Sequence, residues 1–536
     1  MYPGGLLVGT ANPNTAGAAQ TTVCSSAGGS KRSAAQPTHW PVYRRSLGFA
    51  ALNPTCLRGS FFAPFAYFSR RAVVLLLAAL ATACSLAPVE QSPTVPLPTA
   101  WKTAAPAAGW ISADAAHDWR AGRWWALWPD PVLDTLMQRI DVGNQNLAAA
   151  LANVDQAQAL LRQQQAQLWP TVGASAGQQR SGGQDQSTSQ SASLGLNVSW
   201  APDLWGRLGD AARAQGASVQ ASEADLGGVR LAAQASLAQA YFNVRELDAE
   251  MALLDEIITG YERAAMITQN RYDVGVAART DTLQAQSTLD NARASRVALA
   301  RGRALAEHAI ALLVGEPPVH FNLPPAPWEG SVPGVPAGVP SELLLRRPDV
   351  AAAERRVAAA NARIGVARAA YFPQLTLTGG LSAGGSHLID VVSAPKLLWS
   401  LGLSLAQYVF DGGARTAAVD QAIAAHDAAT ASYRQSALTA MKEVEDQLTT
   451  LQTLAEQIER VRASAGAAAR VEQQVMNRYQ SGLAAYTEVV TAQASALGAR
   501  RSLMQLQLQR QQAALALVQA LGGGWQAHWA VRKTGL

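Results

Sequence analysis

The chain of 536 residues carries one short motif twice, and this duplication constrains its fold more than any other feature. NRYDVGVAART begins at Asn270, and NRYQSGLAAYT begins at Asn477, 207 positions later. At the same offset, LGLNVSW (194–200) matches LGLSLAQ (401–407). LWPTVGASAG (168–177) matches YFPQLTLTGG (371–380) 203 positions later. Each half therefore has one order: an aromatic-proline pair, two strands, a long segment, the motif and a second long segment.

The long segments are predicted to be helices. No proline occurs from 208 to 272 or from 414 to 479, and apolar residues recur every seven positions at Leu237, Val244, Met251 and Ile258. Shorter helices are expected over 280–314 and 487–521. Gly275 and Gly482 then lie at the turns between paired helices, where a residue free to adopt positive φ ends the first helix.

Four strands are predicted at 171–177, 193–200, 374–382 and 398–410, where small or polar residues alternate with apolar ones. Gly/Ser/Gln-rich loops are expected at 181–190 and 382–390. The alternation suits tilted membrane strands. Four strands cannot close a barrel and an open edge is not tolerated in lipid, so several copies would have to assemble. A soluble β-domain at the end of a coiled coil fits the same periodicity, and the sequence pattern leaves both open.

The N-terminal region reads as an export signal. Arg70 and Arg71 precede the apolar run AVVLLLAALATA, which leads into Cys84. This run is too short to span a bilayer and has the length of a signal-peptide core. The predicted divisions are a disordered or wrongly assigned extension (1–69), a lipoprotein signal peptide (70–83), a first repeat (84–330), a second repeat (331–525) and a tail (526–536). The small residues Ala81, Thr82 and Ala83 before Cys84 resemble a bacterial lipoprotein lipobox, although Ala81 stands where such boxes usually carry Leu. The resemblance implies that Cys84 becomes the acylated N-terminus; the alternative is an ordinary signal peptide that ends at Ala83.

The positions of the cysteines and charged residues argue against disulfides between the repeats and against nucleic-acid binding. The three cysteines, Cys24, Cys56 and Cys84, all lie in the first 84 residues, so no disulfide can join the repeats. Residues 1–83 hold seven basic residues and no acidic one, leaving 36 basic and 38 acidic residues in the rest. This balance argues against nucleic acid as a partner of the body.

Several stretches carry a family resemblance: RWWALWPDPVLDTLM (123–137), DLWGRL (203–208), ALLVGEPP (311–318), LLRRPDVAAAERRVAAANARIGVARAAYFPQLTLTGG (344–380), FDGG (410–413) and ALGGGW (520–525). They resemble the outer-membrane factors of tripartite efflux systems, of the NodT/OprM lipoprotein type related to TolC. The resemblance implies a mainly α protomer with membrane β: long helical hairpins that form a periplasmic helical barrel, and four transmembrane strands that contribute to a 12-stranded trimeric barrel. It also implies a passive duct in the outer membrane, joined by a periplasmic adaptor to an inner-membrane pump of the RND class.

The resemblance assigns roles to residues of the two motifs. The tips that adaptors contact would be Arg271, Tyr272, Gly275, Arg478, Tyr479 and Gly482. The gate would be Thr280, Asp281, Tyr479 and Glu488. Two positions depart from the family, because Ala484 stands where TolC has a linking Arg and Thr491 where it has a second acid. Asp281 and Glu488 also suit a simpler role as acids that stabilise helix N-termini.

Other functions find little support in the sequence. It contains no HExxH, GxSxG, P-loop or CxxC motif, and His308, His320, His387 and His426 lack metal-ligand spacing. We therefore expect no enzyme activity and no cofactor beyond the acyl groups on Cys84. The RRPD block at 346–349 is read as a helix cap with ion pairs, and the Trp124, Trp125 and Trp128 cluster as packing. Two rivals stay open: a duct for type I protein secretion and a soluble periplasmic coiled-coil adaptor.

Overall fold

The computed structural model describes residues 85–90, 93–96, 98, 100–103, 122–184, 186–328, 330, 332–334, 346–393 and 396–526. All belong to the compact unit that spans 70–536. The predicted extension 1–69, the signal peptide 70–83 and Cys84 lie outside the described residues, as does all but the first residue of the predicted tail.

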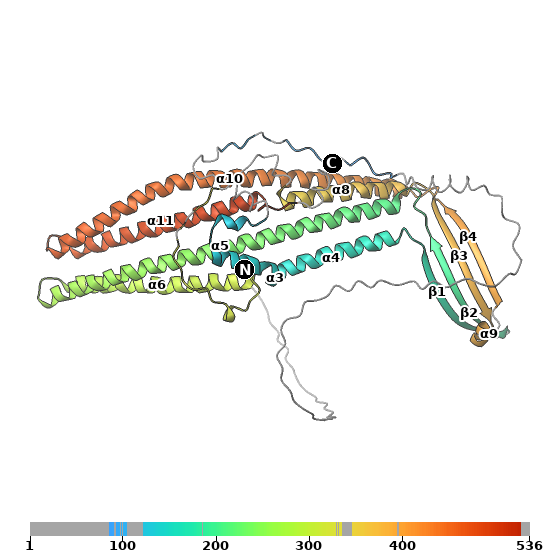
Figure 1. Ribbon diagram of the computed structural model, residues 1–536, viewed down its shortest axis with the longest axis horizontal. Coiled ribbons are helices and arrows are strands. Elements are labelled where there is room, and N and C mark those ends of the chain that lie inside the picture. Colours follow the sequence, from blue (N-terminus) through green and yellow to red (C-terminus); the bar gives the residue numbers. More distant parts are fainter. Residues whose placement is uncertain are drawn as a thin grey trace, which may run out of the picture. The chain divides into compact units, whose positions relative to one another are not determined.

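Helices dominate both halves (Figure 1). The first half contains α3 (Pro131–Gly143), α4 (Gln145–Ala166), α5 (Arg207–Asp273) and α6 (Arg279–Leu313). The second contains α8 (Pro348–Ala369), α10 (Ala414–Gln480) and α11 (Tyr486–Ala520). The four helices predicted around the duplicated motif are confirmed, with their ends within about a residue of the expected positions. No helix in the described part of the chain is both long and apolar enough to cross a bilayer.

The two halves have matching helix lengths. Helices α5 and α10 each contain 67 residues, which corresponds to about 100 Å. Helices α6 and α11 each contain 35, and α4 and α8 each contain 22. In each half the long helix pairs with the helix after its turn, so α5 with α6 and α10 with α11 form two hairpins that lie side by side (Figure 1).

Four strands form one antiparallel sheet in the order β1-β2-β3-β4. They are β1 (Thr171–Gly183), β2 (Gln186–Trp200), β3 (Gln374–Gly385) and β4 (Lys396–Ala406). The prediction of a loop over 181–190 was wrong, because backbone pairing continues through Arg180 opposite Gln190; a ladder of backbone bonds needs no apolar side chains. Within 382–390, β3 runs on to Gly385 and the short helix α9 (Leu388–Ser393) follows. Strand β4 ends at Ala406, before the expected 410.

The register places most of the apolar side chains of the four strands on one face; Leu398 of β4, opposite Ser382, lies on the other. Leu196 lies opposite Leu381, which lies opposite Trp399. Trp399 is 80% exposed, and the neighbouring leucines of β4 are also exposed. Small and polar residues, such as Asn197 and Ser400, occupy the alternate positions. The sheet thus presents a broad apolar face with no cover in the described part of the chain.

The main core lies where the two halves meet at mid-length. Trp124, Trp125 and Trp128 are buried there, and the Trp124 indole donates to Gln234 Oε1 (3.1 Å), which confirms the expected packing role. Arg347, directly before α8, bonds Asp349 (2.7 Å), Glu443 (2.6 Å) and the Ala520 carbonyl (3.0 Å). The expected ion pairs of the RRPD block are confirmed, and they tie α8 to α10 and α11. The expected cap is not formed, because the Arg347 side chain at the N-cap position of α8 makes no capping hydrogen bond.

Candidate functional site

The two hairpin turns have the same backbone geometry. Gly275 has φ 76° and Gly482 has φ 77°. In the first turn the Gly275 amide donates to the Tyr272 carbonyl (2.9 Å) and the Val276 amide to the Arg271 carbonyl (2.8 Å). The second turn repeats both bonds at the same lengths, 207 positions later. Each turn is a Schellman motif, which satisfies the last carbonyls of the long helix.

Arg271 connects the first tip to the second. Its Nη1 donates to the carbonyl oxygens of Tyr479 (2.8 Å) and Gln480 (3.4 Å). Its guanidinium carbon lies 4.9 Å from the centre of the Tyr479 ring. A cation at the C-terminal end of α10 meets the negative end of the helix dipole, so charge and hydrogen bonding act in the same direction.

Tyr479 is the centre of a small buried cluster below the tips. Its ring packs edge-on against Tyr486 (5.2 Å between centroids), and its hydroxyl donates to Thr268 Oγ1 (3.2 Å). Ala285 of α6 and Val489 of α11 complete the buried set. Burial raises the pKa of Tyr486 to about 12, so this phenol stays neutral at any physiological pH. The cluster joins residues of all four hairpin helices.

The predicted gate residues lie just past the turns. Glu488 accepts from the Ala485 backbone amide (3.2 Å), so it caps its own helix, and its carboxylate is 3.9 Å from Arg478. Asp281 is half-buried and Thr280 is exposed, both in the first turn of α6. Ala484 packs against the buried cluster, and the Thr491 hydroxyl donates to the Thr487 carbonyl of its own helix (2.9 Å).

The structure brings only some of the predicted tip residues together. Arg271 and Tyr479 meet across the hairpins, whereas Arg478 donates to Leu483 of its own turn (3.2 Å) and Tyr272 is half-exposed. Sequence reasoning missed Thr268 and Tyr486, which fix the Tyr479 side chain. The spacing of seven between Tyr479 and Tyr486 was a usable signal, since it places the second ring just across the turn.

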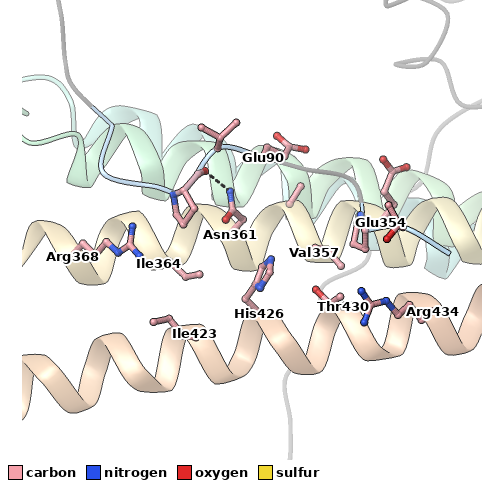
Figure 2. A pocket seen from close by; sticks show the side chains of 15 residues that line it. Glu90, Glu354, Val357, Asn361, Ile364, Arg368, Ile423, His426, Thr430 and Arg434 are labelled. Carbon is pink, nitrogen blue, oxygen red and sulfur yellow. Dashed lines mark hydrogen bonds between the residues drawn. The ribbon is translucent and has the colours of Figure 1, made fainter.

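A second structured region is the segment that follows Cys84. Ser85 donates to Asp210 Oδ1 at the start of α5 (2.9 Å), and the Pro88 carbonyl accepts from Asn361 Nδ2 (2.8 Å). Figure 2 shows this segment over α8 and α10, above a cavity of about 460 Å³ lined by Val357, Ile364, His426 and others. Gly365 allows the close approach, because a Cβ there would lie 2.2 Å from Asp210 Oδ2 and 2.7 Å from the Ala87 nitrogen.

The Ser85 contacts fix where the segment begins. Asp210 lies in the first turn of α5 and Arg368, which donates to the Leu86 carbonyl (3.4 Å), lies in the last turn of α8. Both helix ends adjoin the sheet, because β2 ends at Trp200 and β3 begins at Gln374. The residue after Cys84 is thereby held beside the sheet, far along the helices from the tips. Among the described residues, no three His, Cys, Asp or Glu side chains are placed to hold a metal ion.

Comparisons with known proteins agree with this geometry. A family model described as "Outer membrane efflux protein" matches residues 136–316 and 339–523. The chain is 31% identical over 452 residues to the Escherichia coli "Cation efflux system protein CusC", covering 83% of this chain and 96% of that one. It is 32% identical over 458 residues to the Pseudomonas aeruginosa "Pyoverdine export outer membrane protein OpmQ", covering 83% and 95%.

Solved structures give the same result. A crystal structure of CusC superimposes with a TM-score of 0.74 at 29% identity and covers 82% of this chain and 100% of that one. The outer-membrane channel OprN gives a TM-score of 0.74 at 29% identity, with 83% and 100% covered.

Proposed function

We propose that this chain, which belongs to the outer membrane efflux protein family and is an outer-membrane efflux channel, works as a homotrimer in a three-part pump. The TolC-like fold expected from the sequence is confirmed by the likeness to CusC and OprN along their whole length. Because this likeness covers the entire CusC chain, it argues against the alternative that the protein is a soluble periplasmic adaptor. The divisions 84–330 and 331–525 are proposed as its two repeats, in keeping with the matched ranges 136–316 and 339–523.

The sheet is the observation that carries the trimer. β1 and β4 each have an outer edge without a partner strand in the described part of the chain, and the apolar face is exposed. Lipid does not tolerate unpaired backbone groups. Pairing β4 of one copy with β1 of the next satisfies both edges, and three copies give the expected 12 strands.

The segment after Cys84 supports a lipid anchor. Ser85 is held beside the sheet, so acyl chains on Cys84 would start at the level where the strands enter the membrane. These acyl groups are the only cofactor that we propose, and we propose that the chain catalyses no reaction.

The tips are the proposed meeting point with other components. A periplasmic adaptor would contact the surface around Arg271, Tyr272, Gly275, Arg478, Tyr479 and Gly482, and would connect the duct to an inner-membrane pump of the RND class. The gate would comprise Thr280, Asp281, Tyr479 and Glu488. The link from Arg271 to the Tyr479 carbonyl supports this assignment, because it is one of the contacts that hold the two tips together, alongside the buried cluster around Tyr479.

The test is a susceptibility panel on a deletion strain, covering metal cations, antibiotics and toluene. Complementation uses the wild type, the tip variant Gly482→Pro and the control Gly466→Ala. Gly466 is exposed and lies in the middle of α10, away from its ends. We expect at least one compound class to inhibit the deletion strain, with rescue by wild type and control but not by Gly482→Pro. Rescue by Gly482→Pro would rule out the tip as the docking surface.

A further inference from the structure

The two halves have equivalent helices, but equivalent residues differ in how far they are buried. Helices α5 and α6 map onto α10 and α11 with a single offset at all four ends. Within the chain, α5 packs on both α8 and α11 of the second half (Figure 1). The corresponding surface of α10 would need equivalents of those helices, which are α4 and α6 of another copy.

Pairs of equivalent residues show the difference. Leu231 of α5 is 8% exposed and its counterpart Leu438 of α10 is 49% exposed. Nearer the tip, Ala264 is 3% exposed whereas Val471 is 50% exposed. Apolar side chains are thus retained on the face of α10 that corresponds to the covered face of α5.

The two tips also differ in the contacts made by their equivalent arginines. Arg271 reaches from the first hairpin to Tyr479 and Gln480 of the second. The counterpart of Arg271 is Arg478, whose side chain is 56% exposed and, among the residues that the structure describes, meets Leu483 and Glu488 of its own hairpin. The counterparts of Tyr479 and Gln480 are Tyr272 and Asp273, which end α5 at the surface.

We propose that Arg478 of each copy binds the first hairpin tip of the next copy, donating to the Tyr272 and Asp273 carbonyl oxygens and covering the Tyr272 ring. The occupant of this surface is therefore a second copy of the same chain. The inference rests on the trimer proposed above and adds the contact that holds neighbouring tips together. Three contacts within chains and three between chains would alternate around the ring.

Charge favours the contact between copies. Arg271 donates to the backbone carbonyl of Gln480, whose side chain is neutral, whereas the equivalent residue for Arg478 is Asp273. The Asp273 carboxylate lies at the exposed end of α5 and accepts only a neutral donor, Gln269 Nε2 (2.7 Å), among the described residues. In the proposed contact Arg478 would face the negative end of the α5 dipole as Arg271 faces that of α10, and only the contact between copies would add an opposite charge. The contact between copies should therefore be the more salt-sensitive of the two.

The experiment is site-specific photocrosslinking of the full-length chain in cells. A benzophenone amino acid replaces Tyr272 or, as the matched control, Tyr479. We expect position 479 to give products within one chain, since its surroundings are buried there. We expect position 272 to give covalent dimers of this chain, with the crosslink mapped by mass spectrometry to 475–488 of the second copy. Adding Arg478→Ala should reduce the dimer yield severalfold, and Arg478→Lys should reduce it less.

Native mass spectrometry of the same preparations distinguishes failure of the proposed tip contact from failure of the proposed trimer. If the trimer is intact but position 272 crosslinks only within its own chain or to another protein, the contact is overturned and the trimer stands. If the purified channel is monomeric, the proposed trimer fails and the contact fails with it. An unchanged dimer yield in Arg478→Ala would remove Arg478 from the interface.

Discussion

The positive φ of the glycine at each tip determines how much a side chain there would cost. Gly275 has φ 76°, and a Cβ there would meet nothing within 4 Å, so the cost of a side chain is purely conformational. We expect Gly275→Ala to destabilise the first hairpin by about 1–2 kcal/mol. Gly260→Ala, in the interior of the same helix with open space around it, should instead stabilise by up to about 1 kcal/mol. Thermal unfolding of the purified variants in detergent measures both; equal shifts would refute the argument.

The Tyr479 hydroxyl gives a second prediction for a single residue. It donates to Thr268 Oγ1 in a buried site, so Tyr479→Phe should cost about 1 kcal/mol of stability. Tyr272→Phe, the matched change in the first hairpin, should cost close to nothing because Tyr272 is half-exposed. A double-mutant cycle with Thr268→Val measures the coupling by denaturant unfolding. Additive effects of the two changes would mean that the hydroxyls do not interact.

At the scale of helices, the packing of α5 on α11 should depend on pH. Burial raises the pKa of Glu246 to about 7, with a further rise from Glu250 and an opposing effect from Arg501. The folded state therefore holds a proton that the unfolded state releases near pH 4.5, and stability falls as pH rises from about 4.5 to 7. We expect Glu246→Gln to flatten this part of the stability profile, and Glu256→Gln, on the exposed side of α5, to leave it unchanged. Melting temperatures between pH 5 and 8 provide the test.

The segment after Cys84 depends on the space at Gly365 of α8. A methyl group there would overlap Asp210 and Ala87, so Gly365→Ala should displace this segment at a cost of about 1–3 kcal/mol. Hydrogen exchange of residues 85–90 should increase, while Gly216→Ala, a change of the same kind with open space, leaves it unaltered. Unchanged exchange in Gly365→Ala would show that helix α8 shifts instead.

The elements themselves could be predicted from the sequence because their signals are local and repeated. The proline-free runs and the two glycines located α5, α6, α10 and α11 to within about a residue. The ends of β1 and β2 could not be predicted in this way. Their pairing through Arg180 and Gln190 depends on a neighbouring backbone, and polar side chains there resemble those of a loop.

For the whole molecule, the sequence identified the family and the repeat but not how the halves touch. The Arg271 bond to the Tyr479 carbonyl joins positions 208 residues apart and has no local pattern. The same holds for Ser85 and Asp210, 125 residues apart. Long-range contacts of this kind are set by how the hairpins pack, and the duplicated motif reveals only that two similar tips exist.

The equal lengths of the hairpin helices fix one distance in the assembled duct. With 67 residues in both α5 and α10, the two turns end at the same height above the sheet, which is what lets Arg271 reach Tyr479. Removing seven residues from each helix of one hairpin alone would bring its tip about 10 Å closer to the sheet and separate these residues. Removing them from both hairpins would keep the tips level while shortening the duct. The duplication therefore lets the chain match a periplasm of a different depth, provided that both halves change together.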